Sequence, residues 1–191
     1  MNKLKIKICG IKTPELAAQT VQAGADYIGI IFEPTSKRYV DINLAKQIAA
    51  AVIANNAIPV AVFTTHTAEQ MLKICNLINI TTVQLHGKIS QQQHNLLPKY
   101  FTRFYVHEIP NDADITRDYL LLDKPFDINT MNYNGKFRLA LAGGININTI
   151  KFALEKFRPE IIDLSSGVED ETGEKNIKFI KDFIHTARNI L

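Results

Sequence analysis

The chain has 191 residues, 46% of them hydrophobic and 21% charged, which is ordinary for one soluble globular domain. Its net charge of +3 is small and its basic residues are scattered, so the composition argues against a nucleic-acid partner and permits a small anionic ligand. No apolar run is long enough to cross a membrane, and two distant cysteines without a signal peptide lead us to expect reduced thiols and a cytoplasmic protein.

The first predicted strand has two very different faces. Ile6 and Ile8 point to one side, because side chains alternate along a strand. Lys5, Lys7 and Cys9 point to the other side, which therefore lines a polar interior. Cys9 stands at the carboxyl end of the strand, where parallel α/β folds collect their chemistry. A free cysteine is more often a small buried hydrophobe, and the residues alone leave both roles open.

Lys7 should find a polar partner inside the protein, since an unpaired buried ammonium group is very costly. Gln84 and Asp163 are the candidates, because both face inward if His86 does. A Lys7 side chain in bulk solvent would refute both this strand phase and the fold proposed below.

The rest of the chain alternates short apolar runs with helical patterns. Thr13 and Pro14 begin the first helix, since threonine caps a helix and proline fits its first turn, and Gly24 ends it. Further strands are predicted at residues 27–32, 59–63, 81–86, 104–109, 119–123, 138–144 and 161–167. Further helices are predicted at residues 43–53, 67–79, 146–158 and 177–190, and residues 90–101 become helical in composition after a polar start. Cys75 falls on the apolar face of its helix and is interpreted as a core residue.

Eight strands in this alternation predict a closed (β/α)₈ TIM barrel that forms one domain over residues 1–191, with a doubly wound sheet as the alternative. Such barrels usually have about 250 residues. The shortage falls in the connections at 110–118 and 124–137, so we expect a shortened fifth helix and a reduced or missing sixth helix. Residues 124–136 should be irregular, since they are rich in Asn and contain Gly135.

Loss of the sixth helix should leave the outer face of strands six and seven under-covered. The leucines on this face are Leu120, Leu122, Leu139 and Leu141. Neighbouring helices, the irregular segment with Phe126, Met131 and Tyr133, or a second molecule in a homodimer are the three candidate covers.

The polar residues that follow the strands meet on one rim of the predicted barrel. They are Cys9, the loop at 32–39, His86, Asp123, Gly143, Gly144 and the run at 163–167. The glycine pair precedes the helix predicted from residue 146, and free N–H groups at a helix N-terminus bind phosphate. The Ser-Ser-Gly run in the next unit adds donors, and phosphate binding by the last two loops recurs in this architecture. A plain tight turn is the alternative for the glycine pair.

Arg38 lies in the polar loop between the second strand and its helix. A planar guanidinium group can hold a carboxylate with two parallel hydrogen bonds, which lysine cannot do. Without further information, a solvated basic loop is the commoner role for such a residue.

Seven stretches of the chain, in order, resemble phosphoribosylanthranilate isomerase, a tryptophan-pathway enzyme with a (β/α)₈ barrel. They are Lys-Ile-Cys-Gly-Ile at 7–11, Gly-Ala-Asp-Tyr-Ile-Gly at 24–29, Ser-Lys-Arg-Tyr-Val at 36–40, Val-Gln-Leu-His-Gly at 83–87, Leu-Leu-Asp at 121–123, Leu-Ala-Gly-Gly-Ile at 141–145 and Asp-Leu-Ser-Ser-Gly-Val-Glu at 163–169. The resemblance covers nearly the whole chain, and its first and last stretches together are quite specific.

The resemblance implies an Amadori rearrangement of N-(5-phosphoribosyl)anthranilate, a small phosphorylated substrate, without a cofactor or metal. Asp123 would be the general acid that protonates the furanose ring oxygen, and Cys9 the general base that takes the C2 proton as a thiolate. A thiol with an ordinary pKa of about 8.5 is only slightly ionised at pH 7, so the site has to favour the thiolate, through Lys7 or the substrate pose.

The same resemblance implies the binding roles of the remaining rim residues. Arg38 would hold the anthranilate carboxylate, and His86 and Asp163 would contact the substrate. The phosphate would lie in a cradle made by Gly143, Gly144, Ser166 and Gly167.

The chain departs from the family in one segment. A glycine-rich stretch that follows the sixth strand in the family, and is thought to close over the substrate, has only a faint echo at 134–137. Three alternatives therefore stay open: a non-catalytic barrel that binds a sugar phosphate, a related ribose-phosphate isomerase of the histidine pathway, and a structural or partner-binding domain. The histidine-pathway enzyme has an aspartate as base at the end of its first strand, and Cys9 argues against it.

Overall fold

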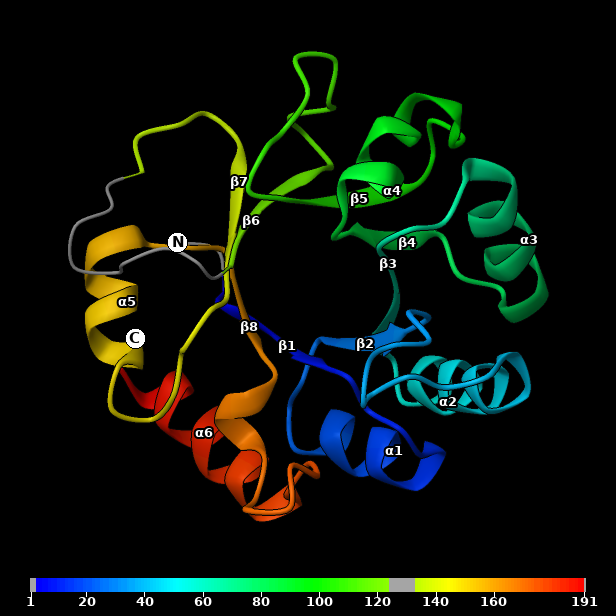
Figure 1. Cartoon of the computed structure of the whole chain (residues 1–191). Helices are drawn as coiled ribbons and strands as arrows, with labels where there is room; N and C mark the ends of the chain where they lie inside the picture. Colours follow the sequence, from blue (N-terminus) through cyan, green and yellow to red (C-terminus); the bar gives the residue numbers. More distant parts are fainter. Residues whose placement is uncertain (1–2, 124–132, 191) are drawn as a thin grey trace.

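Eight parallel strands close into a barrel in chain order, β1 to β8, in the computed structural model, which describes residues 3–123 and 133–190 (Figure 1). The strands are β1 (Lys5–Cys9), β2 (Tyr27–Ile31), β3 (Ile58–Phe63), β4 (Thr82–Leu85), β5 (Thr102–Val106), β6 (Tyr119–Leu122), β7 (Arg138–Leu141) and β8 (Ile161–Leu164). The helices are α1 (Pro14–Gln22), α2 (Ile42–Ala54), α3 (Ala68–Ile78), α4 (Lys88–Gln92), α5 (Ile150–Phe157) and α6 (Ile177–Asn189). The predicted TIM barrel is confirmed, and the doubly wound sheet was wrong.

The early helices begin where their capping residues predict. Thr13 Oγ1 accepts a hydrogen bond from the Leu16 amide at 3.2 Å, immediately before α1. Thr67 and Gln70 form a reciprocal capping box at the start of α3. The predicted core role of Cys75 in this helix is confirmed, because the residue is buried and burial raises the pKa of its thiol to about 12.

The barrel has an apolar outer layer and an interior that changes character along its axis. Ile6 and Ile8 are fully buried in the outer layer, between the strands and the helices. Tyr27, Phe104 and Tyr119 fill the amino-terminal part of the interior, with the last two rings stacked at 4.7 Å. Since these rings fill the interior at the amino end, the polar residues of the interior lie toward the carboxyl end.

The connection from β5 to β6 contains no helix (Figure 1). The short helix expected between the fifth and sixth strands was therefore wrong, because this connection has lost its helix altogether. Two turns replace it. The Ala113 amide donates to the Pro110 carbonyl at 3.1 Å in the first, and the Asp118 amide donates to the Asp114 carbonyl at 2.8 Å in the second. The buried Asp118 carboxylate also accepts from the backbone amides of Arg103 and Asp114. These bonds give the Arg103 and Asp114 amides a partner in a connection that has no helix.

The outer face of β6 and β7 is covered, contrary to the expectation of an under-covered patch. Its four leucines are between 0% and 7% exposed. Tyr133 and Phe137 pack against the same core cluster, and the Tyr133 hydroxyl donates to the Phe137 carbonyl at 2.9 Å. This agrees with the expected cover from the segment itself. The predicted irregular conformation of residues 124–132, including Phe126 and Met131, lies outside the described residues.

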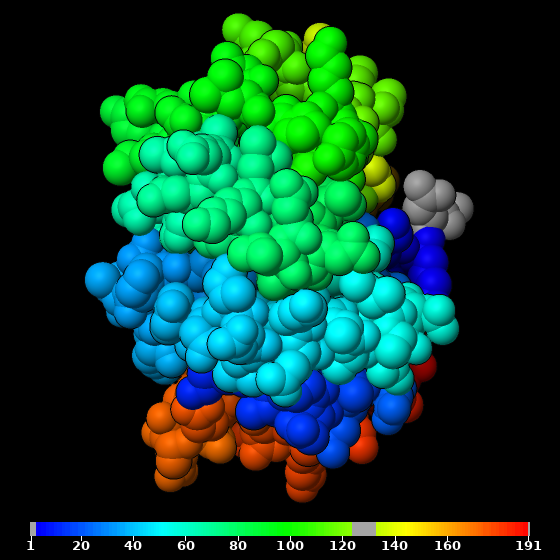
Figure 2. Space-filling model, turned by 90° about the vertical axis from the view of Figure 1, so that its right-hand side faces the viewer, coloured from blue at the N-terminus to red at the C-terminus, as the bar shows by residue number. Residues whose placement is uncertain are grey.

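The helices α1, α2 and α3 follow one another along one flank, as dark-blue, cyan and turquoise bands (Figure 2). Among the residues that the structure describes, none of the helices combines the length and apolar character needed for a membrane span.

Candidate active site

A cavity of about 290 Å³ opens at the carboxyl ends of the strands. All nine residues predicted from the sequence line it: Cys9, Arg38, His86, Asp123, Gly143, Gly144, Asp163, Ser166 and Gly167. They come from loops after β1, β2, β4, β6, β7 and β8 or from the strand ends, so closure of the barrel brings together residues that are far apart in sequence.

Lys7 lies in the barrel interior beneath this cavity and is fully buried. Its Nζ donates to Gln84 Oε1 at 2.8 Å and to Asp163 Oδ2 at 2.7 Å, so both predicted partners are confirmed. The bond to Gln84 crosses the interior, since β1 and β4 are not neighbours. Burial alone would lower the pKa of Lys7, but Asp163 and, to a smaller extent, Cys9 together outweigh it and the pKa is raised.

Cys9 is 7% exposed, and its thiol fits against Gly29 on the neighbouring strand. A Cβ atom at position 29 would lie 2.6 Å from the Cys9 sulfur, so only glycine leaves room for the thiol there. Burial raises the pKa of Cys9, while the Lys7 charge acts in the opposite direction. The expected influence of Lys7 is thus present but outweighed, and the thiol form predominates at neutral pH in the free protein.

His86 and Asp123 lie at the mouth of the cavity, with side chains 40% and 28% exposed. His86 Nε2 is 4.0 Å from Asp123 Oδ2, which is too long for a direct hydrogen bond. On the inner side of the ring, Nδ1 lies 3.0 Å from Gln84 Nε2. A polar chain therefore runs from Asp163 through Lys7, Gln84 and His86 toward Asp123.

Arg38 does not extend into solvent, as a merely basic loop residue would. Its stem crosses Gly10, where a Cβ would lie 2.4 Å from Arg38 Cδ. Its Nε and Nη2 donate to the two oxygens of Glu169 at 2.6 and 3.0 Å. Lys175, buried beside them, also donates to Glu169. Burial would raise the pKa of Glu169, but these cations lower it to about 2.

Glu169 and Lys175 are site residues that the sequence reasoning missed. Glu169 ends the last stretch used for the family resemblance, which was a signal for it. Lys175 had no such signal, because its burial depends on the loop between β8 and α6 folding back over the barrel.

The two glycine loops approach each other at one side of the cavity. Gly143 and Gly144 have φ values of 72° and 79°, a conformation that other residues rarely adopt. A Cβ at Gly167 would lie 2.3 Å from the Ile145 carbonyl oxygen, so this contact also needs glycine. The predicted helix start at residue 146 was wrong: α5 begins at Ile150.

A capped turn leads into α5. The Asn146 side chain accepts from the Asn148 amide at 2.9 Å, and the Asn146 carbonyl accepts from the Ile150 amide at 3.0 Å. The Thr149 hydroxyl accepts from the Asn146 amide at 3.0 Å and holds the same turn. The glycine pair is therefore separated from the helix by this turn rather than placed directly on the helix N-terminus.

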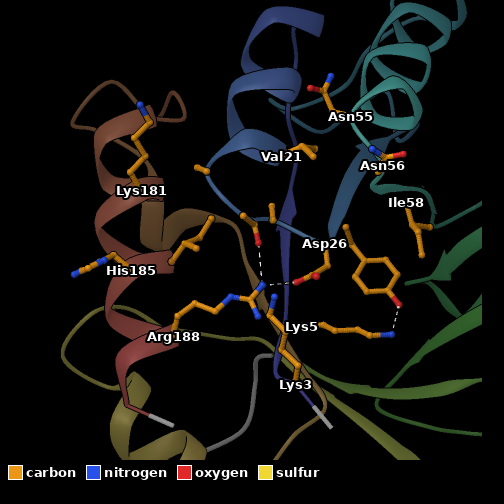
Figure 3. Close-up of a pocket in the computed structure, with 15 residues that line it drawn as sticks. Lys3, Lys5, Val21, Asp26, Asn55, Asn56, Ile58, Lys181, His185 and Arg188 are labelled. Carbon is orange, nitrogen blue, oxygen red and sulfur yellow. Dashed lines mark hydrogen bonds and ion pairs between the residues drawn. The ribbon is translucent and has the colours of Figure 1, made fainter.

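A larger hollow of about 560 Å³ lies at the opposite end of the barrel, near the amino ends of β1 and β2 (Figure 3). Arg188 and Asp26 point toward each other on its wall, and the Arg188 guanidinium also donates to the Leu4 and Gly24 carbonyls. The Arg188 and Asp26 charges are bound to backbone carbonyls and to each other, so they are not available to a ligand. The smaller cavity is therefore the better candidate for the active site.

Within residues 3–123 and 133–190, no group of three or more His, Cys, Asp or Glu side chains is placed to hold a metal ion.

Comparison with known proteins agrees with the geometry of the smaller cavity. The family model described as N-(5'phosphoribosyl)anthranilate (PRA) isomerase matches residues 6–186. Proteins named N-(5'-phosphoribosyl)anthranilate isomerase from Chlamydia trachomatis and Thermotoga petrophila are each 34% identical, over 98% of this chain and 98% and 100% of theirs.

Solved structures give the same result. A structure of monomers generated from the dimeric phosphoribosylanthranilate isomerase of Thermotoga maritima is 32% identical over 97% of this chain and 99% of that chain, with a TM-score of 0.83. A second structure, with reduced 1-(o-carboxyphenylamino)-1-deoxyribulose 5-phosphate bound, has a TM-score of 0.84 with the same coverage. Since both the sequence and the fold match over nearly the whole length, the chain belongs to the phosphoribosylanthranilate isomerase family.

Proposed function

We propose that this chain isomerises N-(5'-phosphoribosyl)anthranilate in tryptophan biosynthesis, with Cys9 as the general base and Asp123 as the general acid. The observation that carries the proposal is the lining of one cavity by a thiol, a carboxyl group, a guanidinium group and two glycine-containing loops. In a member of this family, those groups can move two protons and hold the two anionic ends of the substrate.

The reaction would proceed by proton transfers alone. Asp123 gives its proton to the furanose ring oxygen, the bond from that oxygen to C1 breaks, and an iminium group forms between C1 and nitrogen. Cys9, as the thiolate, takes the proton from C2, and the electrons of that C–H bond neutralise the iminium nitrogen to give an enolamine. Tautomerisation of the enolamine gives the ketone, with no atom gained or lost.

The raised pKa of Cys9 fits this sequence of steps if the thiolate forms only when substrate is present. Ring opening would place a positive iminium group beside the thiol, and an adjacent positive charge favours the thiolate. The buried Lys7 ammonium group adds to the same effect from below.

Arg38 would bind the anthranilate carboxylate through the edge of its guanidinium group that Glu169 does not occupy. Glu169 accepts from Nε and Nη2, which directs the Nη1 edge elsewhere and restricts rotation of the side chain. Glu169 would therefore act as a positioning residue that sets the orientation of Arg38 before substrate binds.

Asp163 would accept a hydrogen bond from a hydroxyl group of the sugar. Its Oδ2 is bound by Lys7, whereas its buried Oδ1 has no hydrogen-bond partner among the residues that the structure describes. A buried carboxylate oxygen without a donor is costly, and a substrate hydroxyl would satisfy it. The phosphate would bind between Gly143–Gly144 and Ser166–Gly167, where the two loops approach each other.

Steady-state turnover of freshly prepared N-(5'-phosphoribosyl)anthranilate tests the function. We expect saturable conversion to the open-chain ketose phosphate, identified by co-chromatography with authentic product. Binding of the reduced product analogue without any turnover would instead favour the non-catalytic barrel.

The proposal extends to the assembly and location of the enzyme. A homodimer is supported by the similar Thermotoga maritima enzyme, which is described as dimeric. The covered leucines of β6 and β7 make that face a poor interface, and sedimentation velocity over a range of concentrations tests the assembly. A cytoplasmic location is supported by the two cysteines, both free thiols.

A further inference from the structure

We propose that Lys7 and Gln84 hold His86 as the neutral tautomer that carries its proton on Nε2, on the Asp123 side of the ring. This tautomer would be present in the free protein, whatever reaction the cavity supports. Lys7 and Gln84 are then positioning residues for His86, a role that neither their types nor their positions in the sequence would indicate.

Lys7 fixes the orientation of the Gln84 amide. An ammonium group has three donors and no acceptor, so the Gln84 atom that lies 2.8 Å from Lys7 Nζ is the amide oxygen. The amide NH₂ group of Gln84 consequently faces the other way, 3.0 Å from His86 Nδ1. Because an NH₂ group only donates, Nδ1 accepts through its lone pair, and the proton of the neutral ring is on Nε2.

Burial fixes this order of donors and acceptors. Lys7 is 0% exposed and Gln84 is 2% exposed, so neither side chain can exchange its partner for bulk water. Lys7 is anchored from the other side by Asp163, its paired neighbour in the strand register, at 2.7 Å. Reversal of the Gln84 amide would bring its NH₂ group against the Lys7 ammonium group, where neither can accept, so the buried Lys7–Gln84 hydrogen bond would be lost whichever ring nitrogen carried the proton.

The consequence for the site is a neutral donor beside the proposed acid. A second proton on Nδ1 would meet the Gln84 NH₂ group, so the arrangement opposes an imidazolium ion. The pKa of His86 is lowered, chiefly because neighbouring atoms shield part of the ring from water, with the Lys7 and His107 charges adding to this and Asp123 opposing it. With Nε2 4.0 Å from Asp123 Oδ2, an oxygen atom between them can accept a hydrogen bond from the Nε2–H group.

Long-range ¹H–¹⁵N correlation spectra of histidine-labelled free protein test this tautomer directly. The chain has five histidines, and the signal missing from His86→Asn identifies His86. We expect the wild-type spectrum at pH 7.5 to show a protonated Nε2 and an unprotonated Nδ1. Gln84→Glu replaces the donor by a carboxylate of the same shape, so the proton should move to Nδ1 and the His86 pKa should rise by about 1–3 units.

Gln92→Glu is the matched control, because it adds the same charge at an exposed position of α4. It should leave the His86 signals unchanged. A wild-type His86 protonated on Nδ1, or an equal mixture of tautomers, overturns the proposal even if Gln84→Glu does not fold. A folded Gln84→Glu protein with the wild-type His86 spectrum also overturns it. Neither result would bear on whether the protein turns over substrate, which the steady-state assay decides.

Discussion

The two ends of the barrel both carry charged side chains around a hollow, but they use those charges differently. At the amino end, the larger hollow is lined by groups such as Arg188, which binds two backbone carbonyls and Asp26. At the carboxyl end, the smaller cavity is lined by Cys9, Asp123 and an Asp163 oxygen that has no donor among the described residues. The size of a cavity therefore does not identify the active site. Polar lining groups that still lack a hydrogen-bond partner, such as this Asp163 oxygen, identify it better.

The largest effect should come from Asp123→Asn, at the carboxyl end. The amide has nearly the shape of the acid but no proton to release, so kcat/KM should fall by about 100- to 10,000-fold. Thermal unfolding should change little, because Asp123 is partly exposed at the cavity mouth. Steady-state kinetics with a thermal melt checks both parts, and near-normal kcat/KM would remove Asp123 as the acid.

Glu169→Gln should weaken the hydrogen bonds that orient Arg38 while keeping the Arg38 side chain in the cavity. Charged hydrogen bonds of this kind contribute roughly 1.5–3 kcal/mol, so KM should rise by about 10- to 100-fold while kcat falls less. Glu171→Gln, at an exposed position of the same loop, is the control and should keep the wild-type KM. A fall in kcat at constant KM would contradict a positioning role through Arg38.

Arg188→Ala should show the opposite pattern at the amino end. Loss of the bonds to Leu4, Gly24 and Asp26 should lower the free energy of unfolding by about 1–3 kcal/mol. The kcat/KM of the folded variant should stay within about twofold of wild type, since the proposed proton transfers take place at the other end of the barrel. Lys181→Ala, an exposed residue of the same hollow, should change neither quantity. Chemical denaturation and kinetics on the same samples decide whether the two ends are separable.

The smallest effect concerns acid stability. The pKa of Glu169 is about 2 in the folded protein and lies near 4.5 ordinarily. A lowered folded pKa contributes stability above the ordinary value, and this contribution is lost as the pH falls from about 4.5 through about 2. Glu169→Gln should therefore lose less stability than wild type over this range. Parallel unfolding-against-pH curves for the two proteins would contradict the ion cluster at the carboxyl end.

Sequence reasoning succeeded where the deciding interactions are periodic or local. Alternation along β1 alone placed Lys7 inside the barrel. A buried ammonium group without a partner is costly, so the inward-facing Gln84 and Asp163 were predicted to bind it, as they do. The rim residues followed from where the strands end, because all parallel strands end on one side.

It failed where loops decide the outcome. Glu169 and Arg38 are 131 positions apart, and only the folded loops bring them together. The connection without a helix between β5 and β6 depends on Asp118, whose carboxylate binds the Arg103 amide of β5 and the Asp114 amide within the connection. The helix α5 begins at Ile150, after a capped turn that starts at Asn146, and composition does not distinguish such a turn from the first turn of the helix itself.

The most direct test of the account compares the same substitution at the two cysteines. Cys9 lies in the carboxyl-end cavity and Cys75 in the outer core, and both are free and buried. We predict that Cys9→Ser lowers kcat/KM by at least about 100-fold with little change in stability, because an alcohol is a far poorer base than a thiolate. Cys75→Ser should lower stability and leave kcat/KM of the folded protein near wild type. Near-wild-type kcat/KM in folded Cys9→Ser would contradict the central claim that this thiol is the base.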